Sequence, residues 1–191
     1  MTGTVRQKSI VATESVFSKD GKYRYLVRKI WNKDLPKAAI VLLYPGYANE
    51  LICDTTTMLC VNQAVALGFG GLDILNIFSL VGVMSVSGDT AGLTDKTNDN
   101  CILESAKTAD KIIVATGRGN NKAVIARTGE VIKLLEAHTE KLFCIADKNG
   151  NAGFHPLSPR GAVRVDVERY QRVTKRTGDR EISIWAAKAV A

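Results

Sequence analysis

Two polar stretches of this chain carry side chains that could do chemistry together. The first runs from Pro45 to Thr56 and includes the carboxylate of Asp54. The second is His155-Pro-Leu-Ser158, in which a histidine held beside a proline could donate a hydrogen bond to a developing anion. Ser158, and Arg160 just after it, could hold phosphates. These residue types predict an anion-stabilising site; the alternatives are a helix cap at Asp54 and a rigid surface turn at His155.

Apolar runs predict the elements that would position these two stretches. The run Ala38–Leu43 is too short for an independent helix and predicts a strand buried on both faces, which stops at Tyr44-Pro45-Gly46. Further strands are predicted over residues 72–78, 111–116 and 141–146, and helices over 55–67, 99–108 and 122–138, with caps at Asp54 and Asn98-Asp99. This order predicts an α/β fold, a three-layer sandwich around a parallel four-stranded sheet. Both polar stretches should then reach its carboxyl edge, where ligands bind.

The ends of the chain predict additions to that core. Residues 9–17 and 23–31 are β-prone and predict an N-terminal β-hairpin. The basic C-terminal extension is helix-like near residues 165–175 and β-prone over 181–185. Residues 79–96 form a loop that is long for a compact domain and is therefore a candidate lid. No linker divides the chain, which predicts one domain over residues 1–191 with its core at about 38–160.

Charge is unevenly spread along the chain, whose formal net charge is +7. Residues 1–37 hold nine basic and three acidic side chains, residues 38–154 nine and twelve, and residues 155–180 seven and three. If the two basic ends fold over one rim of the sheet, they would make a surface suited to a polyanion such as DNA. The alternative is a basic, solvated surface without a partner.

Several classes of protein are disfavoured by composition. The four cysteines have no C-x-x-C spacing and predict buried free thiols in a reducing cytoplasm. With two histidines in the chain, we expect no metal site and no cofactor. No apolar run approaches the ~20 residues that a membrane span needs, and we expect no signal peptide, because no long apolar region follows residues 1–8. We therefore expect a soluble, cytoplasmic protein that does not bind membranes.

Two resemblances to known families follow from these motifs. Pro45-Gly46 after the first core strand, Leu75-Asn76 at the end of the second, and His155-Pro-Leu-Ser158 after the last resemble the layout of the uracil-DNA glycosylase superfamily over about residues 38 to 160. The chain is closer in detail to an uncharacterised bacterial and phage domain family with an N-P-S-x-A-D loop, a D-P-T helix start and a terminal R-H-P-L. The segments that match that family, in the same order, are Pro45–Asn49, Asp54–Thr56, Gly68–Leu72, Asn76–Phe78, Asn98-Asp99, Thr116-Gly117 and His155–Leu157.

The glycosylase resemblance implies roles for particular residues. It implies that Asn76 reads the edge of the base, that His155 stabilises the departing base anion, that Leu157 enters the base stack, and that Tyr47 stacks on the extruded base. The superfamily carries Asp or Asn where this chain has Tyr44, which moves the water-directing role to Asn49, Glu50 or Asp54. The base pocket implied in this way is Tyr44, Pro45, Gly46, Tyr47, Asn76 and Phe78, and the DNA contacts are Leu157, Ser158, Arg160, Arg118 and Asn120.

The function implied by the resemblance is excision of a base from DNA. An enzyme that acts on a base must take it out of the stack into a shaped pocket. We therefore expect a monomeric DNA glycosylase that acts on a damaged or modified base in double-stranded DNA, possible substrates including a hypermodified phage base removed in antiviral defence. The alternatives are a non-catalytic nucleic-acid or nucleotide binding module on the same scaffold, and an enzyme that acts on free nucleosides or nucleotides.

Overall fold

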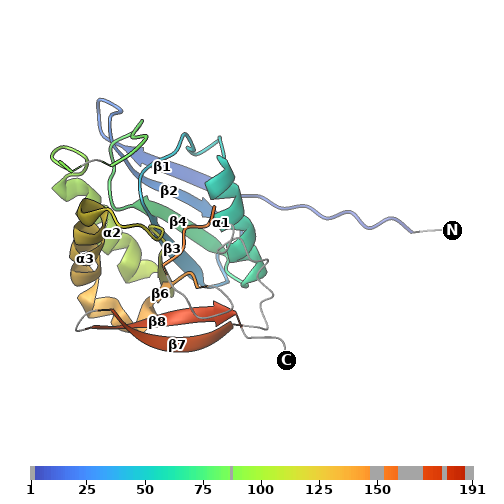
Figure 1. Ribbon diagram of the computed structural model, residues 1–191. Helices are drawn as coiled ribbons and strands as arrows, with labels where there is room; N and C mark the ends of the chain where they lie inside the picture. Colours follow the sequence, from blue (N-terminus) through green and yellow to red (C-terminus); the bar gives the residue numbers. More distant parts are fainter. Residues whose placement is uncertain (1–2, 87, 147–152, 159–169, 178–179, 188–191) are drawn as a thin grey trace.

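A six-stranded mixed sheet forms the centre of the computed structural model, which describes residues 3–86, 88–146, 153–158, 170–177 and 180–187 (Figure 1). In spatial order, the strands of this sheet are β1 (Ala12–Phe17), β2 (Arg24–Ile30), β4 (Gly71–Asn76), β3 (Lys37–Leu42), β5 (Lys111–Val114) and β6 (Leu142–Cys144). The helices are α1 (Thr55–Ala66), α2 (Lys96–Thr108), α3 (Lys122–Leu134) and the 3₁₀ helix η1 (Glu136–Lys141).

The parallel core and the N-terminal hairpin were both predicted correctly, but the place of the hairpin was not, since it was expected to be an addition outside the sheet. Strand β3 pairs in parallel with both β4 and β5, and β5 pairs in parallel with β6. The hairpin is part of the same sheet, because β2 pairs antiparallel with β4, with Val27 opposite Ile74. A sheet of six strands, rather than four with an addition, therefore brings the first residue of β2 next to the ends of the parallel strands.

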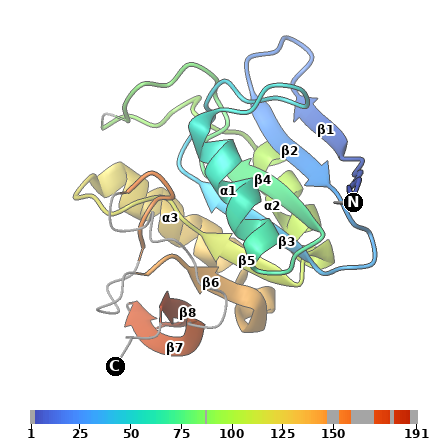
Figure 2. The same cartoon turned by 90° about the vertical axis from the view of Figure 1, so that its right-hand side faces the viewer.

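Alternating apolar residues of the strands build two cores, one on each face of the sheet. From β3, Ala38, Ile40 and Leu42 pack on the face covered by α1. Ala39 and Val41 pack on the opposite face, which α2 and α3 cover. Figure 2 shows α1 in front of the sheet and α2 behind it. The alternation follows from the two-residue period of a strand and gives the three layers.

The starts of the helices are set by polar side chains. Asp54 caps α1 by accepting a hydrogen bond from the backbone N–H of Thr57, as predicted. Helix α2 begins three residues before the predicted residue 99, because Asp95 rather than Asn98-Asp99 supplies the cap. The side chain of Asn98 is fully buried instead, where its Nδ2 donates to the carbonyl of Asn76 at 2.9 Å.

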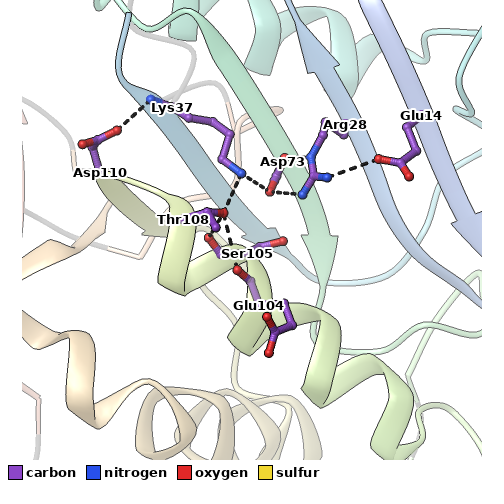
Figure 3. Close-up of polar contacts among 8 residues, drawn as sticks. All are labelled: Glu14, Arg28, Lys37, Asp73, Glu104, Ser105, Thr108 and Asp110. Carbon is purple, nitrogen blue, oxygen red and sulfur yellow. Dashed lines mark hydrogen bonds and ion pairs between the residues drawn. The ribbon is translucent and has the colours of Figure 1, made fainter. Parts of the chain in front are cut away.

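A buried ionic cluster ties three strands together at the edge of the sheet opposite the carboxyl ends of the parallel strands. Asp73 of β4 is 0% exposed and accepts hydrogen bonds from Arg28 Nε at 2.7 Å and Lys37 Nζ at 2.8 Å (Figure 3). Burial by itself would raise the pKa of Asp73, but the hydrogen bonds from Arg28 and Lys37 outweigh it and leave this pKa below its ordinary value. The cluster therefore joins β2, β3 and β4 as a charged unit.

The long loop after β4 and the C-terminal strands complete the described chain. Among the described residues from 79 to 95, the backbone forms no helix or strand, and Ser79 and Leu80 both donate to the carbonyl of Leu93. Strand β7 (Tyr170–Thr177) pairs antiparallel with β8 (Arg180–Ala187). The helix expected near 165–175 is thus wrong over residues 170–175, because this segment pairs with a neighbouring strand, whereas the β-prone residues 181–185 are confirmed. Residues 165–169 lie outside the described residues.

Candidate functional site

A cavity of about 370 Å³ lies on the α1 side of the sheet, where β3, β4 and β5 end. Its polar lining comes from four different segments and consists of Arg24, Asp54, Thr56, Thr57, Thr116 and His155. The rest of its lining, apart from Gly46, is Leu42, Leu43, Tyr44, Ile74 and Leu157. Both polar stretches found in the sequence therefore meet at the carboxyl edge of the sheet, as expected. A few convergent polar groups in a largely apolar pocket are typical of a small-ligand site.

Asp54 is held in the cavity wall by the start of α1. Its Oδ1 accepts from the Thr57 N–H at 2.7 Å, and the residue is 9% exposed. Gly46 lies against the same carboxylate, since a Cβ added there would be 2.1 Å from Asp54 Oδ2. Asp54 therefore caps α1, as one of the two predictions for it stated, and the same carboxylate also lines the cavity.

His155 lines the same cavity from the other end of the fold. Its Nδ1 accepts a hydrogen bond from the Leu157 N–H at 3.1 Å, so the proton of the neutral ring belongs on Nε2. Burial lowers the pKa of His155, although the charge of Asp54 acts in the opposite direction. A Cβ on Gly117, whose φ is +92°, would lie 3.4 Å from the Cβ of His155. The histidine is thus a positioned, neutral hydrogen-bond donor.

Arg24 is the charged residue of the cavity wall that was not predicted for the site from the sequence. It opens β2 and is only 3% exposed. Its Nη1 donates to the carbonyl oxygens of Ala48 at 2.7 Å and Gly46 at 3.4 Å, and its Nη2 donates to Asn76 Oδ1 at 3.0 Å. In the sequence, Arg24 is a cation inside a β-prone run, a pattern that is also found on the solvent-exposed face of a strand. The antiparallel pairing of β2 with β4 buries it.

Five residues predicted for the site are brought together around the cavity. These are Asp54, His155, Tyr44, Gly46 and Leu157. Asn76, the predicted base reader, is buried beside Arg24 and does not line the cavity. Its Oδ1 accepts a hydrogen bond from Arg24, and its buried Nδ2 has no hydrogen-bond partner among the described residues. Asn76 thus supports the cavity wall from behind.

Several other residues that the resemblance implied for the site do not line the cavity. Phe78 is 0% exposed and packs in the core on the α2 side, because it follows β4 into the interior. Pro45 is buried and does not line the cavity, and Tyr47 is 70% exposed and also outside it. Arg118 lies over the ring of Phe154 at 5.2 Å, and Asn120 is exposed; neither lines the cavity.

Of the three residues expected to direct water, Asp54 alone lines the cavity. Asn49 Oδ1 accepts from the backbone N–H groups of Leu51 and Ile52, which closes a local turn. Glu50 accepts a hydrogen bond from the hydroxyl of Ser15 in β1. Both side chains are thus engaged away from the cavity, because the loop turns outward after Ala48.

The remaining residues of the second stretch frame His155. The backbone N–H of Ser158 donates to the carbonyl of His155 at 2.8 Å, so the stretch forms a tight turn. The side chain of Leu157 is 49% exposed. Arg160, expected to hold phosphates, lies outside the described residues.

The expectations for metals, thiols and membranes can be compared with the described part of the chain. No three of its His, Cys, Asp or Glu side chains gather as a metal ion would require. Cys60 is buried, which raises its pKa to about 12, but Cys101 and Cys144 are only partly buried and Cys53 is exposed. The prediction that the cysteines are buried is therefore confirmed for Cys60 and wrong for Cys53. None of the helices described is long and apolar enough to cross a membrane.

Comparison with known proteins places the chain beside one family. The family described as "Protein of unknown function (DUF1643)" matches residues 24–157, a span that begins at Arg24 and ends at Leu157, both in the cavity wall. No curated protein matches the chain. A similar solved structure is the hetero-hexameric glutamate dehydrogenase from Thermus thermophilus, at 15% identity and a TM-score of 0.28. The match covers 70% of this chain and 32% of that one, so this chain spans about a third of its length. None of these findings ties the chain to the uracil-DNA glycosylase superfamily.

Proposed function

The chain belongs to the DUF1643 family, and from its cavity we propose that it is a DNA glycosylase, which hydrolyses the bond between a damaged or modified base and its sugar. The observation that carries this proposal is that Asp54 and His155 line one cavity from two distant parts of the chain. A carboxylate and a neutral imidazole are the two groups that cleavage of an N-glycosidic bond would use, one for each fragment.

The size and lining of the cavity support a nucleobase as the group bound. At about 370 Å³ it lies near the lower end of the range for small-ligand pockets, which is about 300–1,000 Å³. Leu42, Leu43 and Ile74 offer flat apolar contact, whereas the threonine hydroxyls and His155 offer hydrogen bonds. That combination suits a heterocycle with polar edges.

The proposed reaction divides the work between the two side chains. Water adds to C1′ of the sugar as the C1′–N bond breaks, and the electron pair of that bond leaves with the base. The Asp54 carboxylate offsets the positive charge that develops on the sugar and accepts the proton that the water loses. The Nε2–H of His155 donates a hydrogen bond to the base, which carries the negative charge. The Thr57 N–H orients the carboxylate, and the Leu157 N–H fixes the tautomer of the imidazole.

DNA is the proposed source of the base. Leu157 is a half-exposed apolar side chain of the cavity wall, and its proposed role is to fill the gap that an extruded base leaves in the stack. The net charge of residues 1–37, nine basic against three acidic side chains, would attract the phosphate backbone. The finer proposals are a monomer acting on double-stranded DNA, with a hypermodified phage base as the substrate in antiviral defence.

The proposal is tested by incubating the purified protein with uracil-containing, unmodified and phage-modified DNAs and measuring released base and alkali-labile abasic sites. We expect release from one of these DNAs, and a decrease of about 100-fold or more with Asp54→Asn or His155→Gln. Glu50→Gln is the matched control, because this carboxylate belongs to the same loop but lies outside the cavity, and it should retain activity.

A specific observation favours a second function, a non-catalytic nucleic-acid or nucleotide binding module. Tyr44 stands where the glycosylase resemblance calls for a water-directing residue, and its hydroxyl donates to the carbonyl of Met84 at 3.2 Å. If no base is released from any of the DNAs, while the protein still binds DNA, the result would favour the binding module and exclude the glycosylase. Release that is unaffected by both substitutions would show that the chemistry occurs elsewhere.

A further inference from the structure

The cavity wall contains a buried cation that the proposed reaction does not yet use. Arg24 is 3% exposed, and its two Nη atoms donate only to neutral oxygens, those of Gly46, Ala48 and Asn76. Its Nε is buried and has no hydrogen-bond partner in the segments that the structure describes. Within the described part of the chain, no carboxylate forms an ion pair with this guanidinium.

A buried guanidinium without an anionic partner is unfavourable. Arginine stays protonated in proteins, so it cannot escape the cost of burial by losing its charge. Burial lowers the pKa of Arg24 without neutralising the side chain, and the charge of Asp54 acts in the opposite direction. Such a charge needs a counter-ion, and the cavity that Arg24 lines is the space in which one could be supplied.

The other groups around the cavity leave this need unmet. The Asp54 carboxylate is engaged with the N-terminus of α1, whose partial positive charge already offsets part of its own. His155 is uncharged above its lowered pKa, and Thr56, Thr57 and Thr116 are neutral. Asp54 is therefore the charged group of the cavity wall that would repel a bound anion. The neutral donors around it could form hydrogen bonds with that anion.

We propose that Arg24 makes the cavity selective for a heterocycle that carries negative charge. In the proposed reaction this is the base as it leaves the sugar, so Arg24 would act together with His155 on the departing fragment. That role in turnover rests on the proposed function, whereas the preference for an anionic ring rests on the burial of Arg24 in the cavity wall. The ligand class is thus an acidic pyrimidine-like or purine-like ring, rather than a neutral ring of the same size.

The preference is tested by calorimetric binding of two probe rings in slightly alkaline buffer. One is 5-nitrouracil, which is anionic there, and the other is thymine, which is neutral and of similar size. We expect the wild-type protein to bind the anionic ring about tenfold more tightly or better. Arg24→Gln should abolish the difference and Arg24→Lys should keep part of it, because lysine retains the charge but not the planar set of donors. Lys107→Gln, which changes an exposed cation of α2 outside the cavity, is the matched control and should change nothing.

Two results would overturn the inference: equal affinity of the wild-type protein for both rings, or an unchanged preference in folded Arg24→Gln. If Arg24→Gln does not fold, the affinity of the wild-type protein for 5-nitrouracil is measured as the pH is lowered instead. This affinity should fall as the probe is protonated and loses its charge. An affinity that stays constant would contradict the role of the charge. Failure of the proposed function is distinguishable, because the ring preference would then persist without release of any base from DNA.

Discussion

At the scale of the residue, the cavity depends on close contacts that leave room for one residue type. Gly46 allows the backbone to lie against the carboxylate of Asp54, and Gly117 allows the backbone to lie beside His155. Neither glycine does chemistry, but each one determines where a reacting group lies.

The contact at Gly46 gives a direct test of how Asp54 is positioned. Gly46→Ala places a methyl group 2.1 Å from Asp54 Oδ2, so the carboxylate must move and the cap is weakened. We expect a loss of stability of about 0.5–2 kcal/mol in urea unfolding, together with loss of base release. Gly129→Ala in α3 is the control with the opposite sign, because its Cβ would meet nothing within 4 Å and alanine favours a helix. A Gly46→Ala protein with unchanged stability would show that the loop relaxes around the methyl group.

The protonation of His155 predicts how stability depends on pH. Its pKa in the folded protein lies below the ordinary value of 6.5, so the unfolded chain binds a proton more readily. The contribution of neutral His155 to the free energy of unfolding is therefore complete above pH 6.5. It is lost as the pH falls from 6.5 through the lowered pKa of the folded state. Protonation of Nδ1 would also break the hydrogen bond from the Leu157 N–H. In urea unfolding across this interval, His155→Gln should be less sensitive to acid than the wild-type protein; identical pH profiles would contradict the assignment.

At the scale of the element, strand order explains why the two charged clusters lie at opposite edges of the sheet. Asp73 is near the start of β4 and binds cations from β2 and β3, whereas Asn76 ends the same strand beside Arg24 and the cavity. One strand thus carries a structural cluster at one edge and supports the candidate site at the other.

The cluster at Asp73 predicts that a substitution there lowers the free energy of unfolding strongly but does not change the cavity directly. Asp73→Asn would leave Arg28 and Lys37 without their buried carboxylate, which typically costs about 3–5 kcal/mol. We expect that loss in urea unfolding at neutral pH, and a smaller difference as acid protonates Asp73 in the wild-type protein, since its pKa is lowered from 3.8. Glu14→Gln removes the exposed partner of Arg28 and should cost less than about 1 kcal/mol. Equal effects of the two substitutions would show that the cluster does not hold the strands.

At the scale of the whole molecule, the N-terminal segment is separate from the sheet. Residues 3–11 are exposed, and Figure 1 shows this segment running away from β1. It contains Arg6 and Lys8, which are therefore available to phosphates without any rearrangement of the fold. The proposed DNA interface would thus extend beyond the cavity.

Salt dependence measures that contribution. If Arg6 and Lys8 each neutralise one phosphate, the slope of log affinity against log salt should become shallower by about 0.9 for each residue changed to Gln. Fluorescence anisotropy with a labelled duplex gives the slope. Lys107→Gln is the control, because this lysine of α2 already pairs with Glu104. Affinity that does not respond to salt in the wild-type protein would exclude a duplex held through its phosphates.

The sequence by itself determined the parts of the fold that depend on local order. The alternation of apolar runs with helix-like segments identified the four parallel strands, and Asp54 was recognised as a helix cap from its neighbours. The convergence of Asp54 and His155 also followed, because the carboxyl ends of parallel strands lie at one edge. These inferences need only the period of the side chains and the direction of the strands.

Tertiary structure decided which of the other polar side chains near the carboxyl edge line the cavity. Arg24 and Asn76 are 52 positions apart in the chain and meet because β2 pairs with β4, a choice that no local pattern specifies. Glu50 and Asp54 belong to the same short loop, yet a turn after Ala48 directs Glu50 to Ser15 and leaves Asp54 in the cavity. Burial of a charged or polar residue depends on strand pairing and loop path, which are set by contacts distant in sequence. For that reason the buried cation at Arg24 became visible only in the folded chain.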